Sequence, residues 1–188
     1  MQIKLREQNA LSVGKLVNSL VKNIAHQSSA SRMIRRNFIY FSIILVIFLA
    51  DRISKIWMIS LSTSRDNPTI ELLPFINLHL IWNKGIAFGL FSFSESTNYN
   101  LLTILIIFII LVVFYMVIKT KGLEKYCFLM VFGGSIGNVF DRLFYSSVPD
   151  FIDIYYKNFH WFIFNVADIF ITLGVIVLIL NEFVLKNK

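Results

Sequence analysis

The stretch Leu101–Ile118 reads LLTILIIFIILVVFYMVI and contains no charged residue. A helix needs about 20 apolar residues to cross the hydrocarbon core of a bilayer, so this stretch is close to the length of a membrane span. Three further segments are apolar over similar lengths, at about 38–58, 126–145 and 161–183. The sequence therefore predicts a protein that crosses the membrane four times.

The composition supports this prediction. Of the 188 residues, 56% are hydrophobic and 15% are charged, which is more apolar surface than a water-soluble chain of this length can bury. The formal net charge of +7 is compatible with nucleic-acid binding, but the basic residues cluster in short flanks of the apolar segments, as topology signals do. We therefore expect no nucleic-acid partner. The single Cys127 excludes an internal disulfide and a cysteine-rich metal site.

The basic residues also predict the orientation. The loops on one side contain Arg65, Lys84 and Lys157. The start, the loop between the second and third spans, and the tail are far richer in basic residues: Lys4, Arg6, Lys15, Lys22, Arg32, Arg35, Arg36, Lys119, Lys121, Lys125, Lys186 and Lys188. Because cytoplasmic loops are enriched in Lys and Arg, both termini are predicted to be cytoplasmic.

The chain divides into two parts. Residues 1–37 form a basic cytoplasmic extension, and 38–188 form the four-span domain. Part of the extension is predicted to be an amphipathic helix at the membrane interface, because its apolar residues share one helical face: Leu16, Val17, Leu20, Val21 and Ile24. The outer loop at 59–100 alternates polar and apolar residues around Phe75–Leu80, which favours short strands.

This topology brings polar residues from distant parts of the sequence to the outer leaflet. Asp168 lies about seven residues into the last span, or ~10 Å below its outer end. The other polar residues at this level come from the first and third spans and the outer connections: Asp51, Lys55, Asn83, Asn138, Asp141, Arg142 and Asp150. The cytoplasmic halves of the spans are almost purely apolar.

Several of these residues have a structural interpretation that competes with a functional one. Asp51 and Lys55 are four apart, as in an intrahelical ion pair. Asn138, Asp141 and Arg142 share one helical face, where the arginine could counter a carboxylate. A structural polar clasp explains the second group at least as well as catalysis does.

Other polar residues indicate no site. Asp153 is expected to be solvated, and His79 and His160 lack a metal-ligand spacing, so no metal site is predicted. No serine, cysteine or lysine has the context of a nucleophile. The glycines of the third span, which are Gly133, Gly134 and Gly137, are interpreted as helix-packing residues.

Asp150 and Asp168 remain as the candidate reactive groups. A carboxylate near the middle of a membrane helix costs about 2.5–3.5 kcal/mol on insertion scales, so it seldom lies there without a partner or a function. Two close carboxylates cannot both ionise easily. One then keeps a proton while the other stays charged, and the pair can act as acid and base.

Five motifs follow one another in order along this four-span frame. They are DRISK (51–55), NKGIAF (83–88), GGSIGNVFDR (133–142), VPDF (148–151) and FNVAD (164–168). In this order, over about residues 38–183, the sequence resembles lipoprotein signal peptidase, also called signal peptidase II.

The resemblance implies an all-α polytopic fold with four transmembrane helices, a small extracytoplasmic β-rich cradle at 59–100 and a short amphipathic helix before the last span. It implies an aspartic endopeptidase of the bacterial inner membrane that cuts diacylglyceryl-modified prolipoproteins before the lipidated cysteine, at the outer leaflet. The implied partners are these substrates and membrane lipid, and no cofactor is expected. Asp150 and Asp168 match the catalytic aspartates. The implied supporting positions are Asp51, Lys55, Asn83, Gly85, Asn138, Asp141, Arg142 and Asn165.

Two alternatives remain at the level of the residues. Buried carboxylates beside an arginine also occur in transporters and proton relays, although ionisable groups would then be expected across the whole bilayer. The carboxylates could also only lock the helices together in a non-catalytic assembly factor.

Overall fold

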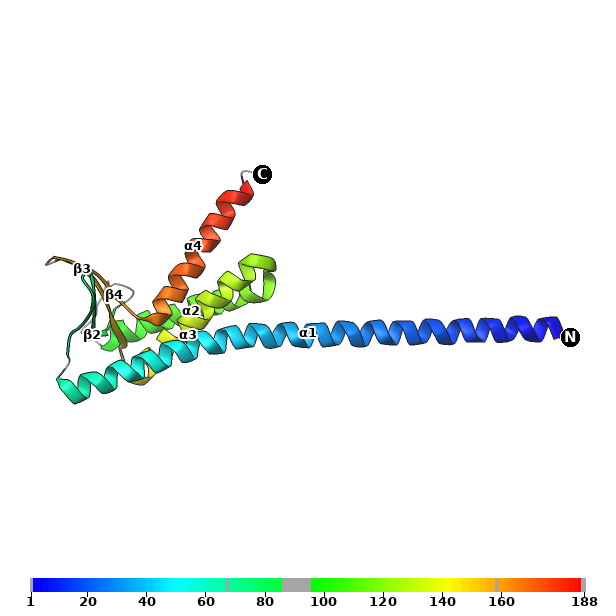
Figure 1. The fold of residues 1–188 in the computed structure, drawn as a ribbon, viewed down its shortest axis with the longest axis horizontal. Helices are drawn as coiled ribbons and strands as arrows, with labels where there is room; N and C mark the ends of the chain where they lie inside the picture. The colour runs from blue at the N-terminus through cyan, green and yellow to red at the C-terminus, as the bar shows by residue number, and fades with distance from the viewer. Residues whose placement is uncertain (1, 67, 86–95, 158, 187–188) are drawn as a thin grey trace. The chain divides into compact units, whose positions relative to one another are not determined.

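A computed structural model describes residues 2–66, 68–85, 96–157 and 159–186. The elements follow in the order α1 (Gln2–Arg65), β1 (Ile70–Leu73), β2 (Ile76–Asn83), α2 (Ser96–Lys119), α3 (Gly122–Tyr145), β3 (Val148–Tyr156), β4 (Phe159–Phe164) and α4 (Val166–Lys186) (Figure 1). The chain separates into two compact units, 1–41 and 42–188. The first unit is the leading part of α1, and the fold described below is that of the second.

Four helices of the described chain are long and apolar enough to cross a membrane: Gln27–Arg65, Tyr99–Lys119, Gly122–Tyr145 and Val166–Val184. The prediction of a polytopic membrane protein is confirmed. The last helix begins at Val166, so the span predicted from residue 161 starts too early. Residues 159–164 pair with β3 instead, because their aromatic and β-branched side chains suit a pleated strand.

The small sheet is antiparallel, in the order β1-β2-β3-β4. Its first two strands come from the 59–100 loop, as the alternating pattern predicted. The other two come from the connection between α3 and α4, so the cradle is not confined to that loop. The expected short amphipathic helix before the last span is wrong: the described part of this connection forms β3 and β4. The segment VPDFIDIYY has no clear strand alternation, and it is a strand because it pairs with β2 on one side and β4 on the other.

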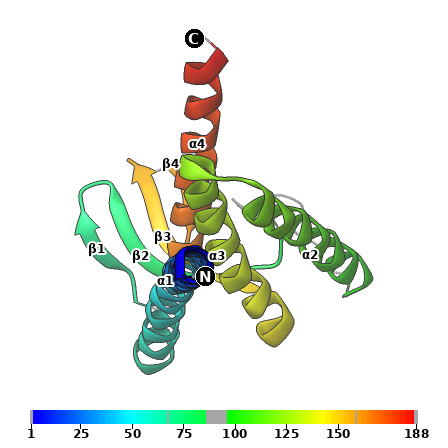
Figure 2. The ribbon, with the colours of Figure 1, turned by 90° about the vertical axis from the view of Figure 1, so that its right-hand side faces the viewer.

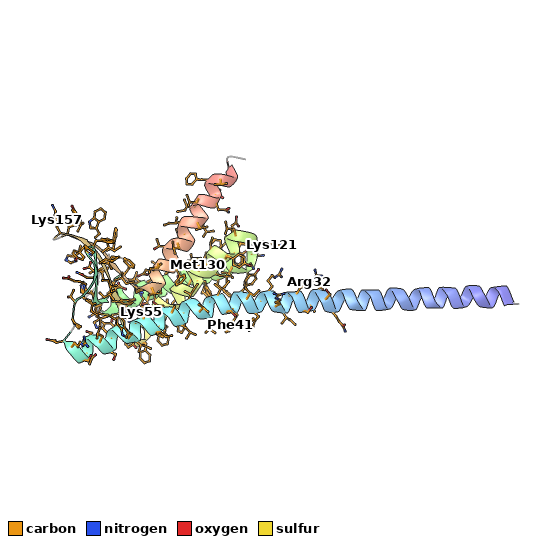
Figure 3. The ribbon with its side chains drawn as sticks, viewed as in Figure 1. Arg32, Phe41, Lys55, Lys121, Met130 and Lys157 are labelled. Atoms are coloured by element: carbon orange, nitrogen blue, oxygen red, sulfur yellow. The ribbon has the colours of Figure 1, made fainter. Side chains whose placement is uncertain are left out.

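The sheet lies at one end of the helices. Lys157, at the β3–β4 turn, and Lys121, between α2 and α3, mark opposite ends of the second unit (Figure 3). The end of α1 is joined to the sheet through a small apolar core of Met58, Leu78, Leu80 and Phe151. The last residues of α3, the first of α4 and the strands β2 and β3 therefore meet at one level.

Helix α3 packs between α2 and α4 (Figure 2). Two of its glycines allow it to approach α4 and α1 closely. A methyl group added at Gly134 would lie 2.6 Å from the carbonyl oxygen of Ala167 in α4. One added at Gly137 would lie 2.6 Å from Oδ2 of Asp51 in α1. The packing role predicted for these glycines is confirmed.

We expect Gly134→Ala to destabilise the protein by about 1–3 kcal/mol, the usual cost of overpacking. The added methyl group meets backbone, so α4 has to move. Thermal unfolding in detergent measures the effect. Gly133→Ala is the matched comparison with a milder clash, since its methyl group would lie 3.3 Å from Ile47 Cβ and 3.4 Å from Ile44 Cα, and a smaller loss is expected. An unfolding temperature equal to that of Gly133→Ala would contradict the prediction.

Candidate active site

Asp150 lies on β3 at the junction of sheet and helices and is 3% exposed. Both of its carboxylate oxygens accept a hydrogen bond from an asparagine side chain. Asn83 Nδ2 donates to Oδ2 over 2.8 Å, and Asn165 Nδ2 donates to Oδ1 over 2.6 Å. The Asn83 amide is itself oriented, because its Oδ1 accepts the backbone N–H of Gly85 at 2.7 Å. Asp150 is therefore held by two neutral donors from different elements.

Asp168 lies in the first turn of α4 and is fixed by the way this helix begins. The backbone N–H of Asp168 donates to Asn165 Oδ1 over 3.1 Å, and the backbone N–H of Asn165 donates to Asp168 Oδ2 over 3.2 Å. This reciprocal pair is a capping box. Asn165 thus caps the helix with its oxygen and contacts Asp150 with its nitrogen, so one side chain links the two aspartates.

The other carboxylate oxygen of Asp168, Oδ1, is connected through Asn138 to a buried ionic cluster. Asn138 Nδ2 on α3 donates to Asp168 Oδ1 over 2.8 Å. Lys55 Nζ on α1 donates to Asn138 Oδ1 over 2.9 Å, to Asp51 Oδ2 over 2.8 Å and to Asp141 Oδ2 over 2.7 Å. Lys55, Asp51 and Asp141 are all 0% exposed, and Figure 3 shows Lys55 near the sheet end of α1.

The cluster joins three helices. Asp51 Oδ1 accepts the backbone N–H of Ala167, at the start of α4, over 3.0 Å. Arg52 donates to Asp141 Oδ1 and lies 5.0 Å from the centre of the Phe140 ring. The predicted Asp51–Lys55 ion pair within α1 is confirmed. Lys55 also donates hydrogen bonds to Asn138 and Asp141 on α3. The i, i+4 spacing within α1 cannot indicate these contacts between helices.

Arg142 is not the counterion of Asp141 that its helical spacing allowed. In the described structure, Asp141 forms its ion pairs with Arg52 and Lys55 and not with Arg142. Arg142 instead donates to the carbonyl oxygen of Gly85 over 2.6 Å and, more weakly, to that of Asn138 at 3.4 Å. It therefore ties the chain just after β2 to α3.

The network contains every candidate site residue named from the sequence. Asp150, Asp168, Asp51, Lys55, Asn83, Gly85, Asn138, Asp141, Arg142 and Asn165 are connected by the hydrogen bonds above. Arg52 was not among the candidates. The sequence signal that could have identified Arg52 as a site residue is its position in the DRISK motif.

Asp153 is not solvated, contrary to expectation. Its side chain is 0% exposed, and its Oδ2 lies 2.7 Å from His160 Nδ1 and 3.8 Å from His79 Nδ1. The strands β2, β3 and β4 bring these three residues together, although His79 is far from the other two in the sequence. They form a group separate from the Asp150–Asp168 pair.

Burial raises the pKa of Asp150 to about 6, and the neighbouring charge of Asp168 contributes in the same direction. Hydrogen bonds from Asn83 and Asn165 and the positive charge of Lys55 act in the opposite direction on this pKa. A carboxyl group that titrates near 6 and interacts with a second one can take up or release a proton close to neutral pH.

A cavity of about 310 Å³ opens beside Asp168. Its lining comes from β4 and from one face of α4: Phe162, Phe164, Asp168, Ile169, Thr172 and Leu173. Asp168 is the one charged residue of this lining. An occupant would therefore meet a carboxyl group at one end and apolar side chains along the rest.

Comparisons with known proteins agree with this arrangement. The family model described as signal peptidase (SPase) II matches residues 43–184. A lipoprotein signal peptidase of Pelagibacter ubique (strain HTCC1062) is 51% identical over 146 residues, covering 78% of this chain and 88% of that protein. One of Anaplasma phagocytophilum (strain HZ) is 40% identical over 149 residues, covering 79% and 94%. A bacterial membrane enzyme structure has a TM-score of 0.62 and 28% identity, covering 76% of this chain and 91% of that one.

The electrostatic contact between the two aspartates predicts the effect of Asp168→Asn. Removing the neighbouring charge should lower the pKa of Asp150 below about 6, while burial, the larger cause, keeps it above the ordinary 3.8. At pH 6, Asp150 should thus be ionised to a greater extent in the variant than in the wild type. Infrared titration of the carboxyl C=O band, assigned by its loss in Asp150→Asn, measures this.

Asp153→Asn is the control for that titration, because it removes a buried carboxylate from the same strand but outside the pair. It should leave the pKa of Asp150 near 6. An unchanged or higher pKa of Asp150 in Asp168→Asn would mean that the two carboxyls do not interact.

Proposed function

The chain belongs to the signal peptidase II family, and from that premise we propose that Asp150 and Asp168 are the catalytic pair of this peptidase. The enzyme is an aspartic endopeptidase that cleaves signal peptides from lipoprotein precursors. The observation that carries the assignment is Asn165, which hydrogen-bonds both aspartates at once and so holds them as a unit. Asp153 is bonded to histidine instead.

The chemistry follows from a pair that shares one proton. The ionised aspartate takes a proton from water, whose oxygen attacks the carbonyl carbon of the scissile peptide bond. The protonated aspartate donates a hydrogen bond to the carbonyl oxygen. When the C–N bond breaks, a proton passes to the leaving nitrogen, and a carboxylic acid and an amine result. The pKa of Asp150 near 6 suits such exchange near neutral pH.

The supporting residues keep the pair in place. Asn83 and Asn165 orient Asp150, while Asn138 and Asn165 orient Asp168. Arg142 holds the chain at Gly85, two residues after the end of β2.

The cavity beside Asp168 suits the lipid of a diacylglyceryl-modified precursor. A substrate cut immediately before its lipidated cysteine carries an acyl chain next to the scissile bond. The α4 lining runs from Asp168 through Ile169 and Thr172 to Leu173, about one helical turn deeper. An acyl chain on that path has its polar attachment at the catalytic pair and its apolar part directed into the bilayer.

The proposed location is the outer leaflet of the bacterial inner membrane, with both termini in the cytoplasm. The excess of Lys and Arg in the start, the α2–α3 loop and the tail supports this orientation. The buried charged side chains of the described residues lie at the sheet end: Asp51, Lys55, Asp141, Arg142, Asp150 and Asp153. A proton path would require buried charged side chains at every depth of the bilayer, so their restriction to the sheet end favours a peptidase.

We expect Asp150→Asn and Asp168→Asn each to lower the cleavage rate at least about 100-fold, since each removes an acid or base from the reaction. A gel-shift assay of a lipidated precursor with purified protein measures the rate. Glu71→Gln, which removes an exposed carboxylate of β1, should cleave at the wild-type rate. Substantial cleavage by either asparagine variant would rule out the pair.

Filling the cavity should reduce turnover of lipidated precursors. Leu173→Trp places a larger side chain in the lining, and we expect kcat/KM to fall about tenfold, as for a pocket that loses fit to an apolar group. Leu180→Trp is the matched control, because Leu180 is exposed on the same helix and outside the cavity. Equal activity of the two variants would place the acyl chain elsewhere.

A further inference from the structure

Lys55 is a fully buried lysine whose hydrogen-bonding capacity is used completely. Its ammonium group has three protons and no lone pair. The three acceptors around it are Asp51 Oδ2, Asp141 Oδ2 and Asn138 Oδ1, all within 2.7–2.9 Å. Two of them are carboxylates that neutralise the charge. The third belongs to a neutral amide, which contributes nothing to charge balance.

The contact with Asn138 fixes the orientation of that amide. An ammonium group only donates, so the amide oxygen has to face Lys55, and the NH₂ group has to face the other way. The group on the other side is Asp168 Oδ1, 2.8 Å from Asn138 Nδ2. Rotation of the amide by half a turn would place a donor against Lys55 and an oxygen against the Asp168 carboxylate. Both contacts would then be unfavourable.

Only one oxygen of Asp168 depends on this arrangement. Oδ2 accepts the backbone N–H of Asn165, whose position is set by the capping box. Oδ1 has its donor from Asn138, whose side chain can rotate once Lys55 is absent. An N–H donor stabilises the charged form of a carboxyl group, and an acceptor in the same place stabilises the protonated form.

We propose that Lys55 is a positioning residue for catalysis: by holding Asn138 Oδ1, it keeps the Asn138 NH₂ group on Asp168 and makes Asp168 the ionised member of the pair. Lys55 touches neither aspartate of the pair and acts through Asn138. The inference rests on the proposed function, because it assigns the resting proton to Asp150 and the base to Asp168.

The neighbouring Arg52 provides a matched control. It is a cation of the same cluster on the same helix, and it donates to Asp141. In the described structure it makes no hydrogen bond to Asn138. Arg52→Met and Lys55→Met each remove one positive charge beside Asp141. Only Lys55→Met releases the Asn138 amide.

The first measurement needs no peptidase activity. In an Asp150→Asn background, infrared titration follows the protonation of Asp168 in the full chain in detergent. With Lys55→Met, the midpoint should move to higher pH by about one unit, while Arg52→Met should move it much less. Because Lys55→Met leaves Asp51 and Asp141 without their shared cation, Lys55→Met/Asp51→Asn is a charge-balanced second variant. The amide introduced by Asp51→Asn keeps an Oδ1 acceptor for the Ala167 N–H.

A double-mutant cycle tests the route through Asn138. In an Asn138→Leu background, the amide is gone and only the direct effect of the Lys55 charge remains, so Lys55→Met should move the midpoint much less than it does with Asn138 present. A midpoint that moves as far there as with Asn138 present would show that Lys55 acts by its charge alone and would overturn the proposal. Equal shifts for Arg52→Met and Lys55→Met would overturn it as well.

The second measurement is the pH profile of cleavage with Asp150 and Asp168 intact. Lys55→Met should move the acid limb to higher pH and lower kcat, with little change of KM for the lipidated precursor. A lower unfolding temperature with an unchanged profile would indicate a merely structural lysine and contradict the proposal. If the wild-type chain cleaves no lipidated precursor at any pH, the proposed function fails, while the infrared titration still decides the role of Lys55.

Discussion

The ion cluster around Lys55 is the interaction on which the rest of the site depends. Two carboxylates, Asp51 and Asp141, are completely buried at the level where α1, α3 and α4 meet. Removing a charge from water costs several kcal/mol per ion unless a partner of opposite charge and further hydrogen bonds replace the water. Lys55 supplies that partner for both, and Arg52 and the Ala167 N–H supply the further donors. Gly137 leaves the space that the Asp51 carboxylate occupies.

The start of α4 connects this cluster to the sheet. A helix N-terminus has N–H groups without intrahelical partners, and anionic groups are stabilised there. Two of these groups in α4 are Ala167, bonded to Asp51, and Asp168, bonded to Asn165. The interactions that begin the helix are thus the same ones that fix Asp168. Since Asn165 also contacts Asp150 on β3, the register of sheet and helix determines the geometry of the pair.

The sequence predicts the parts of this structure that depend on local pattern. The uncharged stretch at 101–118, the strand around Phe75–Leu80 and the pair Asp51–Lys55 follow from hydropathy and periodicity. The pairing between side chains of different elements does not follow from these local patterns. Asp141 could pair with Arg142 by helical spacing, yet it meets Arg52 and Lys55 of another helix. Asp153 is buried because three strands place His79 and His160 beside it. The aromatic run at 159–164 fits a membrane helix by hydropathy, and only its pairing with β3 makes it a strand.

The donors that contact the proposed catalytic pair suit two carboxyl groups that exchange one proton. Within the described structure, the hydrogen bonds to Asp150 and Asp168 come from asparagine amides and one backbone N–H. The cations lie one residue further away: Lys55 bonds to Asn138, and Arg142 bonds to backbone carbonyl oxygens. A direct ion pair with lysine or arginine would strongly favour the charged form of each carboxyl group. Neutral donors orient the oxygens without cancelling their charges, so the repulsion between the carboxylates persists and favours the state in which one of the two holds a proton.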